Sequence, residues 1–164
     1  MNKFALLIAS TLLLAACNDN APTAPANGSA PAASPAADGG KGDLSESRTA
    51  AFKSFMPTFS TMRKMANGDQ AFVPEEFKAK AQQFTKEARE PFEYFQNDPK
   101  GNGDALPVIW EKPEAFKAEQ DKFFAAVDKL NAAAQGGKLD DIKAAVGEVG
   151  ASCKACHDTF RRPK

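Results

Sequence analysis

The feature that most constrains this chain is the segment Cys153-Lys154-Ala155-Cys156-His157, which ends seven residues before the C-terminal end of the sequence. The spacing C-x-x-C-H is the signature of covalent c-type haem attachment. In a helix, Cys153 and Cys156 share one face at positions i and i+3, where both thiols can form thioethers with the vinyl groups of one porphyrin. His157 lies one turn beyond Cys153, which would place its imidazole under the iron as the proximal ligand. The motif therefore predicts one covalently bound haem c.

Three other interpretations of this motif compete with haem. A structural zinc site needs four ligands, whereas His157 is the only histidine and Cys17 is the only other cysteine. A thioredoxin-like dithiol normally opens a helix after a strand, whereas this motif closes an expected helix and follows no βαβ pattern. The third alternative is an unmodified helix that carries the motif by chance. Of these readings, haem fits the residues best.

The N-terminus has the pattern of an export signal. Lys3 supplies a positive charge and an apolar run over residues 4–14 follows it, as in signal peptides. This run is too short to span a bilayer. The stretch at residues 14–17 resembles the lipobox of bacterial lipoproteins, which implies cleavage before Cys17 and attachment of lipid to that cysteine. The alternative is an ordinary secretory signal at residues 1–16 that leaves Cys17 as a thiol.

Residues 17–43 are expected to form a disordered tether between a lipid anchor and a folded domain. They are rich in Ala, Pro, Gly, Ser and Asn and show no apolar periodicity. A flexible chain of about 25 residues reaches roughly 25–30 Å. Asn18, rather than Asp, after the lipidated cysteine favours delivery to the outer membrane. We therefore expect a lipid-anchored protein on the periplasmic side of the bacterial envelope, with no cysteine left for a disulfide.

Residues 44–164 have the length of one domain. The sequence carries 21 basic and 21 acidic residues, so neither nucleic acid nor an anionic membrane surface is implied as a partner. Apolar residues, including most of the 13 phenylalanines, recur with a period near 3.6 in four segments. We expect an all-α, antiparallel four-helix bundle with haem on its C-terminal helix. The expected helices cover residues 44–65, 74–95, 113–134 and 139–161.

Individual residues predict local features of these helices. Asp43, followed three residues later by Glu46, resembles a capping box at the start of the first helix. Pro57 should bend the first helix and Pro91 should kink or interrupt the end of the second, because proline removes a backbone hydrogen bond. Trp110 lies in a longer crossover between the second and third helices, and we expect it to pack on the bundle.

A C-terminal C-x-x-C-H motif on the fourth helix of a bundle resembles the cytochromes c′, the class II cytochromes c. The likeness is strongest from Asp104 to the C-terminal end and includes the runs at 106–110, 115–117 and 147–158. It implies a five-coordinate, high-spin haem with His157 as the sole protein ligand to iron. It also implies binding of nitric oxide and carbon monoxide without stable binding of dioxygen, and a homodimer formed through the first two helices.

The resemblance implies three further residues at the haem. Arg48 matches the family in the first helix and is implied as a haem contact. The same register places Phe52 over the distal face of the iron, where many members have leucine. Arg161 matches a basic residue beside the proximal histidine. Arg161 also has an alternative role, since a cation at a helix C-terminus complements the helix dipole.

Two functions from different classes follow from these residues. In the first, a five-coordinate haem protein binds nitric oxide and buffers or detoxifies it at the cell envelope, without acting as an enzyme. In the second, a low-spin class II cytochrome carries electrons with methionine as the sixth ligand. The candidates for that ligand are Met56, Met62 and Met65, and Met56 lies one turn beyond Phe52. A peroxidase is disfavoured, because peroxide cleavage needs a distal acid–base group and no distal histidine exists. The redox partner is not indicated.

Overall fold

The computed structural model describes residues 40–98 and 100–163. The expected signal peptide at 1–16, the lipidation candidate Cys17 and most of the expected tether lie outside these residues. Within them, no helix is both long enough and apolar enough to cross a membrane. The described residues fold into α1 (Asp43–Asn67), α2 (Pro74–Glu87), the 3₁₀ helix η1 (Glu90–Tyr94), α3 (Val108–Glu111), α4 (Pro113–Gly136) and α5 (Leu139–Phe160).

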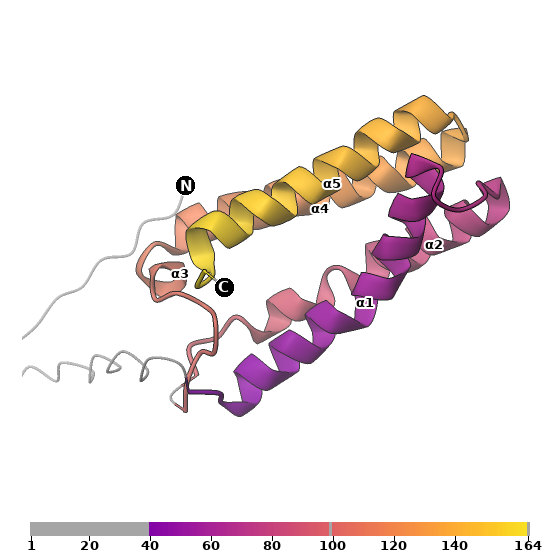
Figure 1. Cartoon of the computed structure of the whole chain (residues 1–164). Helices are drawn as coiled ribbons and strands as arrows, with labels where there is room; N and C mark the ends of the chain where they lie inside the picture. Colours follow the sequence, from indigo (N-terminus) through magenta and orange to yellow (C-terminus); the bar gives the residue numbers. More distant parts are fainter. Residues whose placement is uncertain (1–39, 99, 164) are drawn as a thin grey trace, which may run out of the picture. The chain divides into compact units, whose positions relative to one another are not determined.

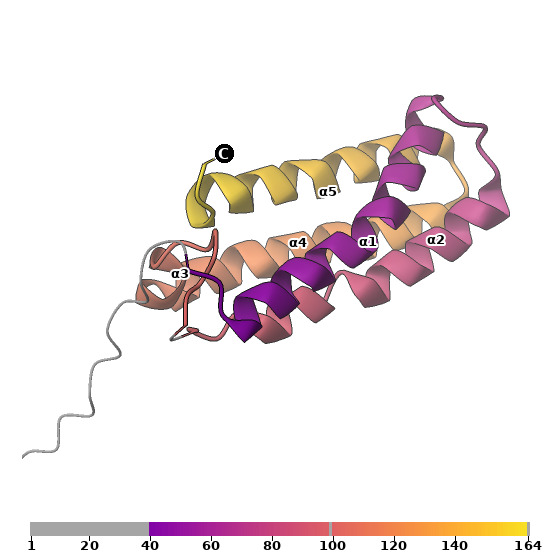
Figure 2. The ribbon, with the colours of Figure 1, turned by 60° about the horizontal axis from the view of Figure 1, so that its bottom comes forward.

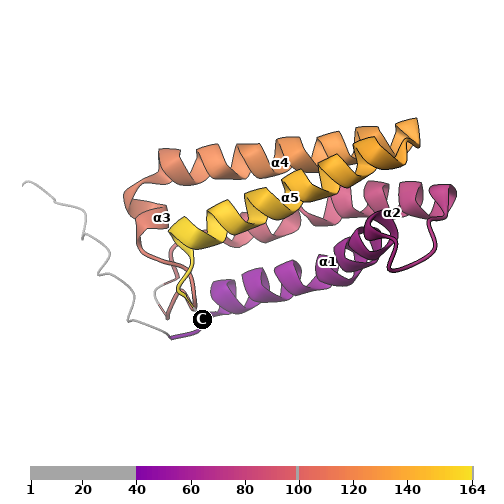
Figure 3. The ribbon, with the colours of Figure 1, turned by 45° about the horizontal axis from the view of Figure 1, so that its top comes forward.

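The four long helices pack as a closed ring. Helix α1 packs against α2 and α5, and α4 packs against the same two helices. Helices α4 and α5 run side by side along their length (Figures 1 and 3). The prediction of an all-α four-helix bundle is confirmed, and the expected helix ranges agree with the observed ones at all but the second helix.

The core consists of two apolar clusters of buried side chains. The larger one, called here the main cluster, draws on all four long helices, and the second cluster comprises Ile109, Phe116 and Phe160. Half-buried Phe92 packs against both clusters. The main cluster contains Phe55, Phe59, Met62, Met65, Ala66, Phe77, Ala81, Phe84, Ala88, Phe123, Val127, Leu130, Ala134, Ile142, Ala145, Val146 and Val149.

The two predicted proline effects differ in kind. Helix α1 continues through Pro57 to Asn67, and its ribbon changes direction along its length (Figures 1 and 2). Helix α2 ends at Glu87, and Pro91 is the second residue of the next element, η1. The second predicted helix is therefore shorter than expected, because proline cannot continue the α-helical hydrogen bonds.

The predicted capping box at the start of α1 is wrong. Gly42 occupies the N-cap position, and neither it nor Asp43 caps the helix through a side chain. The Asp98 carboxylate does this instead, accepting hydrogen bonds from the backbone N–H of Leu44 at 2.9 Å and of Ser45 at 3.4 Å. A Cβ atom at position 42 would lie 2.1 Å from Asp98 Oδ2. Glycine at this position therefore lets a carboxylate from the crossover reach the helix end.

Hydrogen bonds connect the crossover between α2 and α4 to the residues before α1 and to the residue after η1. Gly42 N–H donates to the carbonyl of Gly101 at 3.0 Å, and Gly103 N–H donates to the carbonyl of Gly40 at 2.8 Å. Residues 40–42, at the end of the expected tether, are thus already bonded to the crossover. Trp110 packs against the second cluster, and its indole N–H donates to the Phe95 carbonyl at 2.9 Å. The prediction that Trp110 packs on the bundle is confirmed.

Candidate haem site

Helix α5 is continuous from Leu139 to Phe160 and carries the whole C-x-x-C-H motif in its last turns. Cys153 and Cys156 are free and half-buried. Cys153 packs against the main cluster and Cys156 packs against the second cluster. The i and i+3 spacing therefore places one thiol at the edge of each cluster. His157 follows on the exposed side of the same turn.

The environment of the two thiols suits an apolar partner better than a metal or a redox dithiol. Burial raises the pKa of Cys153. Burial, with smaller contributions from the carboxylate of Glu119 and from Cys153, raises the pKa of Cys156 to about 11. Reactive dithiols instead depend on a lowered pKa. Among residues 40–98 and 100–163, no group of three or more His, Cys, Asp or Glu side chains is placed to hold a metal ion.

Half-buried side chains from three elements pack against one or both of the two clusters. We call this set the seam, and its aromatic members contribute large apolar surface that the clusters do not fully cover. A porphyrin is a flat, largely apolar group, and cofactor sites of this kind are mostly apolar with few polar groups. The residues present therefore fit haem. The seam consists of Phe52, Phe92, Phe95, Cys153 and Cys156.

Phe52 lies on α1 among other aromatic rings. Its ring meets those of Phe55 and Phe92 edge-on, each at a centroid distance of 5.8 Å, and that of Phe95 at 6.1 Å. The ring neighbours of Phe52 carry no hydrogen-bond donor in their side chains. The part of α1 that the family resemblance predicts to lie over the iron is therefore apolar.

Arg48 lies one turn before Phe52 and is buried. Its guanidinium donates to the carbonyl of Tyr94 at 2.9 Å and to that of Asn102 at 2.7 Å, and it lies 4.7 Å above the ring of Phe95. Burial lowers the pKa of Arg48, although the nearby carboxylate of Asp98 acts in the opposite direction. The residue expected to contact haem thus connects α1 to η1 and to the crossover.

Arg161 is the first residue after α5. Its backbone N–H donates to the carbonyl of His157 at 3.2 Å, and its guanidinium pairs with Asp104 Oδ2 at 3.1 Å. The backbone N–H of Leu106 also donates to the Phe160 carbonyl at 2.9 Å. The turn that carries His157 is therefore fixed to the crossover. Sequence reasoning did not identify Asp104 as a partner, because 57 residues separate it from Arg161.

The three methionines considered as iron ligands occupy different environments. Met56 is 51% exposed, whereas Met62 and Met65 are buried in the main cluster at 0% and 1%. Met56 is not one of the half-buried residues of the seam. The structure thus brings Phe52 and the two cysteines to the edges of the core and leaves Met56 on the surface.

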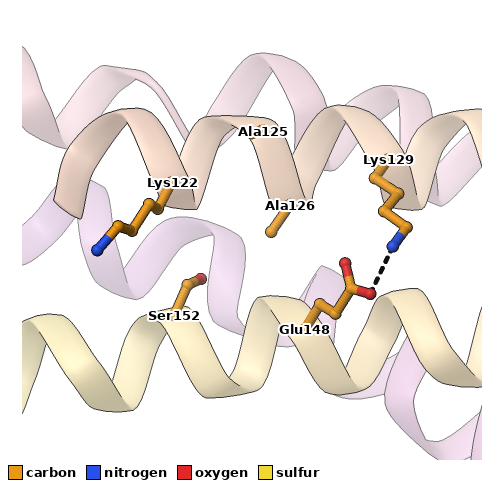
Figure 4. Close-up of a pocket in the computed structure, with 6 residues that line it drawn as sticks. All are labelled: Lys122, Ala125, Ala126, Lys129, Glu148 and Ser152. Carbon is orange, nitrogen blue, oxygen red and sulfur yellow. Dashed lines mark hydrogen bonds and ion pairs between the residues drawn. The ribbon is translucent and has the colours of Figure 1, made fainter. Parts of the chain in front are cut away.

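A shallow pocket of about 340 Å³ lies between α4 and α5 (Figure 4). An ion pair between Lys129 and Glu148 crosses it. None of the residues of the C-x-x-C-H motif lines it, so it is separate from the candidate haem site. Its lining consists of Lys122, Ala125, Ala126, Lys129, Glu148 and Ser152.

The motif and the bundle together match one known protein family. The family model described as Cytochrome C' matches residues 43–161, which contain the complete bundle and the C-x-x-C-H motif. The chain belongs to the cytochrome c′ family. Cytochromes c′ carry a covalently attached haem c. Cys153 and Cys156 are the only cysteines within the matched residues and His157 is the only histidine, so these three residues would hold the haem.

Individual cytochromes c′ are similar over most of their length. The cytochrome c′ of Rubrivivax gelatinosus is 39% identical over 122 residues, which cover 73% of this chain and 95% of the relative. The cytochrome c′ of Alcaligenes xylosoxydans xylosoxydans is 39% identical over 106 residues, covering 65% of this chain and 83% of the relative.

Solved structures of cytochromes c′ share the fold. The crystal structure of the Rubrivivax gelatinosus protein superposes with a TM-score of 0.69 at 36% identity, covering 74% of this chain and 96% of that one. The nitric oxide complex of a leucine-to-alanine mutant of the Alcaligenes xylosoxidans protein superposes with a TM-score of 0.71 at 36% identity, covering 74% and 95%. A leucine-to-glycine variant of the same protein has been solved with bound carbon monoxide.

Proposed function

We propose that this cytochrome c′ binds nitric oxide and carbon monoxide at a five-coordinate, high-spin haem iron whose sole protein ligand is His157. The observation that carries the proposal is the combination of one histidine in the sequence with Met56 exposed on the surface. Neither a second histidine nor Met56 is therefore available as a ligand on the distal side of the iron. Haem supplies an iron with one open coordination position, and the chain determines what can reach it.

The residues around Phe52 explain how the chain would discriminate among gases. Bound dioxygen is stabilised by a distal hydrogen-bond donor, whereas carbon monoxide and nitric oxide depend on one much less. The rings of Phe55, Phe92 and Phe95 surround Phe52, and the Arg48 guanidinium is directed at two backbone carbonyls. Complexes of variants of one related protein with nitric oxide and with carbon monoxide support the binding of these two gases.

The first experiment is the optical spectrum of the purified holoprotein, ferric and ferrous, with and without each gas. We expect a broad high-spin ferrous Soret band that shifts when nitric oxide or carbon monoxide is added. Met56→Leu should leave every spectrum unchanged, because the side chain lies on the surface. Sharp, split ferrous bands that carbon monoxide barely moves would instead mean six-coordinate iron and an electron carrier. Their loss in Met56→Leu would identify Met56 as the ligand and overturn the proposal.

We further propose that the protein acts as a buffer or scavenger of nitric oxide at the periplasmic side of the envelope, rather than as an enzyme. The apolar surroundings of Phe52 offer no acid–base group for turnover. The export signal at 1–16 and the lipobox-like Cys17 support an anchor in the outer membrane. Cys17→Ser should move the protein from the membrane fraction to the soluble periplasmic fraction, and an unchanged membrane fraction would contradict the anchor.

A homodimer formed through α1 and α2 is part of the same proposal. Met56 on α1 and Val73, which directly precedes α2, are the large hydrophobic side chains that the described residues leave exposed. A second copy packed on these helices would cover them. Sedimentation of the holoprotein at micromolar concentration should show a dimer, and a monomer throughout would contradict it.

A further inference from the structure

Phe92 connects more aromatic rings than any other side chain of the described residues. It is half-buried on η1 and packs against both the main and the second cluster. Its partners come from α1, from the residue directly after η1 and from α4. Their centroid distances are 5.8 Å to Phe52, 5.6 Å to Phe95, 6.3 Å to Phe116, 5.8 Å to Phe123 and 5.0 Å to Phe124.

The ring of Phe52 is enclosed mainly by residues outside its own helix. Phe55 contacts it from α1, whereas Phe92 and Phe95 contact it from η1 and its end. The interplanar angles with Phe92 and Phe95 are 72° and 79°, so both contacts are edge-to-face, an arrangement that aromatic pairs favour. A movement of the Phe52 ring away from its position must therefore disturb these two contacts.

The element that carries Phe92 is short and is held partly by side chains from other elements. It is a 3₁₀ helix of five residues, a type with poorer hydrogen-bond geometry than an α-helix. At its two ends, the N–H of Phe92 donates to the Arg89 carbonyl at 3.2 Å, and the N–H of Phe95 donates to the Phe92 carbonyl at a longer 3.5 Å. Side chains from elsewhere fasten it, since Arg48 donates to the Tyr94 carbonyl and Trp110 to that of Phe95.

We propose that Phe92 is a positioning residue that holds Phe52 over the distal face, and that displacement of η1 limits the entry of gas to the iron. The inference rests on the proposed function and adds the element that controls its rate. Phe52 is the barrier, and Phe92 determines how readily that barrier moves. A phenylalanine that served only the core would change the stability of the bundle without changing the rate of ligand entry.

The test is the association rate of carbon monoxide with the ferrous holoprotein, measured by rapid mixing for wild type and Phe92→Leu. Removing the edge-to-face contact should raise the rate roughly tenfold, as expected for a modest fall in the barrier. Phe92→Tyr keeps the ring and should retain the wild-type rate. Phe72→Leu is the matched control: Phe72 is also half-buried against the main cluster, but its ring contact is with Phe77 rather than Phe52.

A double variant separates positioning from packing. Phe52→Ala should raise the association rate by itself, and adding Phe92→Leu to it should then change the rate little, because the ring that Phe92 positions is gone. Equal acceleration by Phe92→Leu in both backgrounds would overturn the proposal. So would a rate unchanged from wild type in Phe92→Leu, whatever its melting temperature.

Two further measurements keep the proposal falsifiable. If Phe92→Leu does not accumulate as holoprotein, Phe95→Leu removes the other contact that η1 makes with Phe52 and should also accelerate association; an unchanged rate would overturn the proposal. The wild-type spectrum separates the two levels of inference. Absence of carbon monoxide binding by the wild type would reject the proposed function, whereas normal binding with an unaltered rate in the variants would reject only the role of Phe92.

Discussion

Arg48 shows how one buried side chain can hold several segments together. Its two donated hydrogen bonds reach the carbonyls of Tyr94 and Asn102, which lie 46 and 54 residues away along the chain. A planar guanidinium can donate in two fixed directions at once, whereas a lysine ammonium on a flexible stem cannot reproduce that fork. The position one turn before Phe52 means that the same contacts fix the α1 segment that we propose to face the haem.

We therefore predict that Arg48→Lys lowers the free energy of unfolding by about 2 kcal/mol, since at least one buried carbonyl loses its donor. Chemical denaturation of the holoprotein at pH 7 measures this change. Arg63→Lys, at an exposed position on the same helix, is the control and should stay within about 0.5 kcal/mol of wild type. Equal stability of the two variants would show that the hydrogen bonds of Arg48 contribute little.

At this scale, sequence predicted the residues whose chemistry is local. Cys153, Cys156 and His157 were identified from their spacing, which places both thiols on one face of a helix, and the structure has all three on α5. The ion pair of Arg161 with Asp104 and the carbonyl partners of Arg48 could not be predicted, because a partner many residues away leaves no pattern beside the residue it contacts. The resemblance implied that Arg48 contacts haem and that Arg161 lies beside the proximal histidine, without indicating which protein groups hold them.

The start of α1 illustrates the corresponding limit for whole elements. The helix itself was predictable, because Phe55, Phe59 and Met62 recur with helical spacing and are buried as that spacing requires. Its cap was not, since Asp98 supplies it from the crossover, and Asp43, the first residue of the helix, remains exposed. Local sequence favours Asp43 as the cap, whereas the folded chain brings the distant Asp98 to that position.

The cap makes a pH-dependent prediction about this element. Burial would raise the pKa of Asp98, but hydrogen bonds from the N–H groups of Lys100, Leu44 and Ser45 outweigh it and hold that pKa below its ordinary value. A carboxylate with a lowered pKa stabilises the fold fully above its unfolded-state pKa of about 3.9. That contribution is lost as the pH falls below about 4 and through the lower pKa of the folded state.

Asp98→Asn should therefore be less stable than wild type at pH 7, and the difference should shrink as the pH falls below about 4. Thermal unfolding across this range measures both effects. Asp43→Asn is the matched control, because Asp43 is an exposed acid at the same helix end whose partner is the exposed Lys100. A parallel loss of stability in both variants at every pH would contradict the capping role of Asp98.

On the scale of the whole molecule, the two apolar clusters divide the core unequally. The main cluster draws on all four long helices, whereas the second has only three fully buried members. Phe92 packs against both, and the two cysteines lie one on each. Periodicity predicted the buried faces of the helices but not this division, because a helical pattern gives the side of a helix that is buried and not which other helices it packs against. A haem bonded to both thiols would lie against both clusters.

This division predicts where the haem-free protein loosens. A ligand that binds only the folded state adds stability, and local opening follows the least buried parts of a fold. In a Cys153→Ser/Cys156→Ser variant without haem, amide protection should fall most in η1, in α3 and at the end of α5. It should persist where the main cluster is fully buried, for example at Met62 and Ile142.

Hydrogen exchange with mass spectrometry, comparing this variant with the wild-type holoprotein, measures that distribution. Gly68→Ala in the haem-bound protein serves as the control. Gly68 has a positive φ of 85°, which strains any other residue. The substitution should therefore destabilise the bundle at the C-terminal end of α1, away from η1. That variant should lose protection near the turn between α1 and α2 and keep it in η1. An even loss along all four long helices of the haem-free variant would mean that the clusters form one cooperative core and that haem stabilises the bundle as a whole.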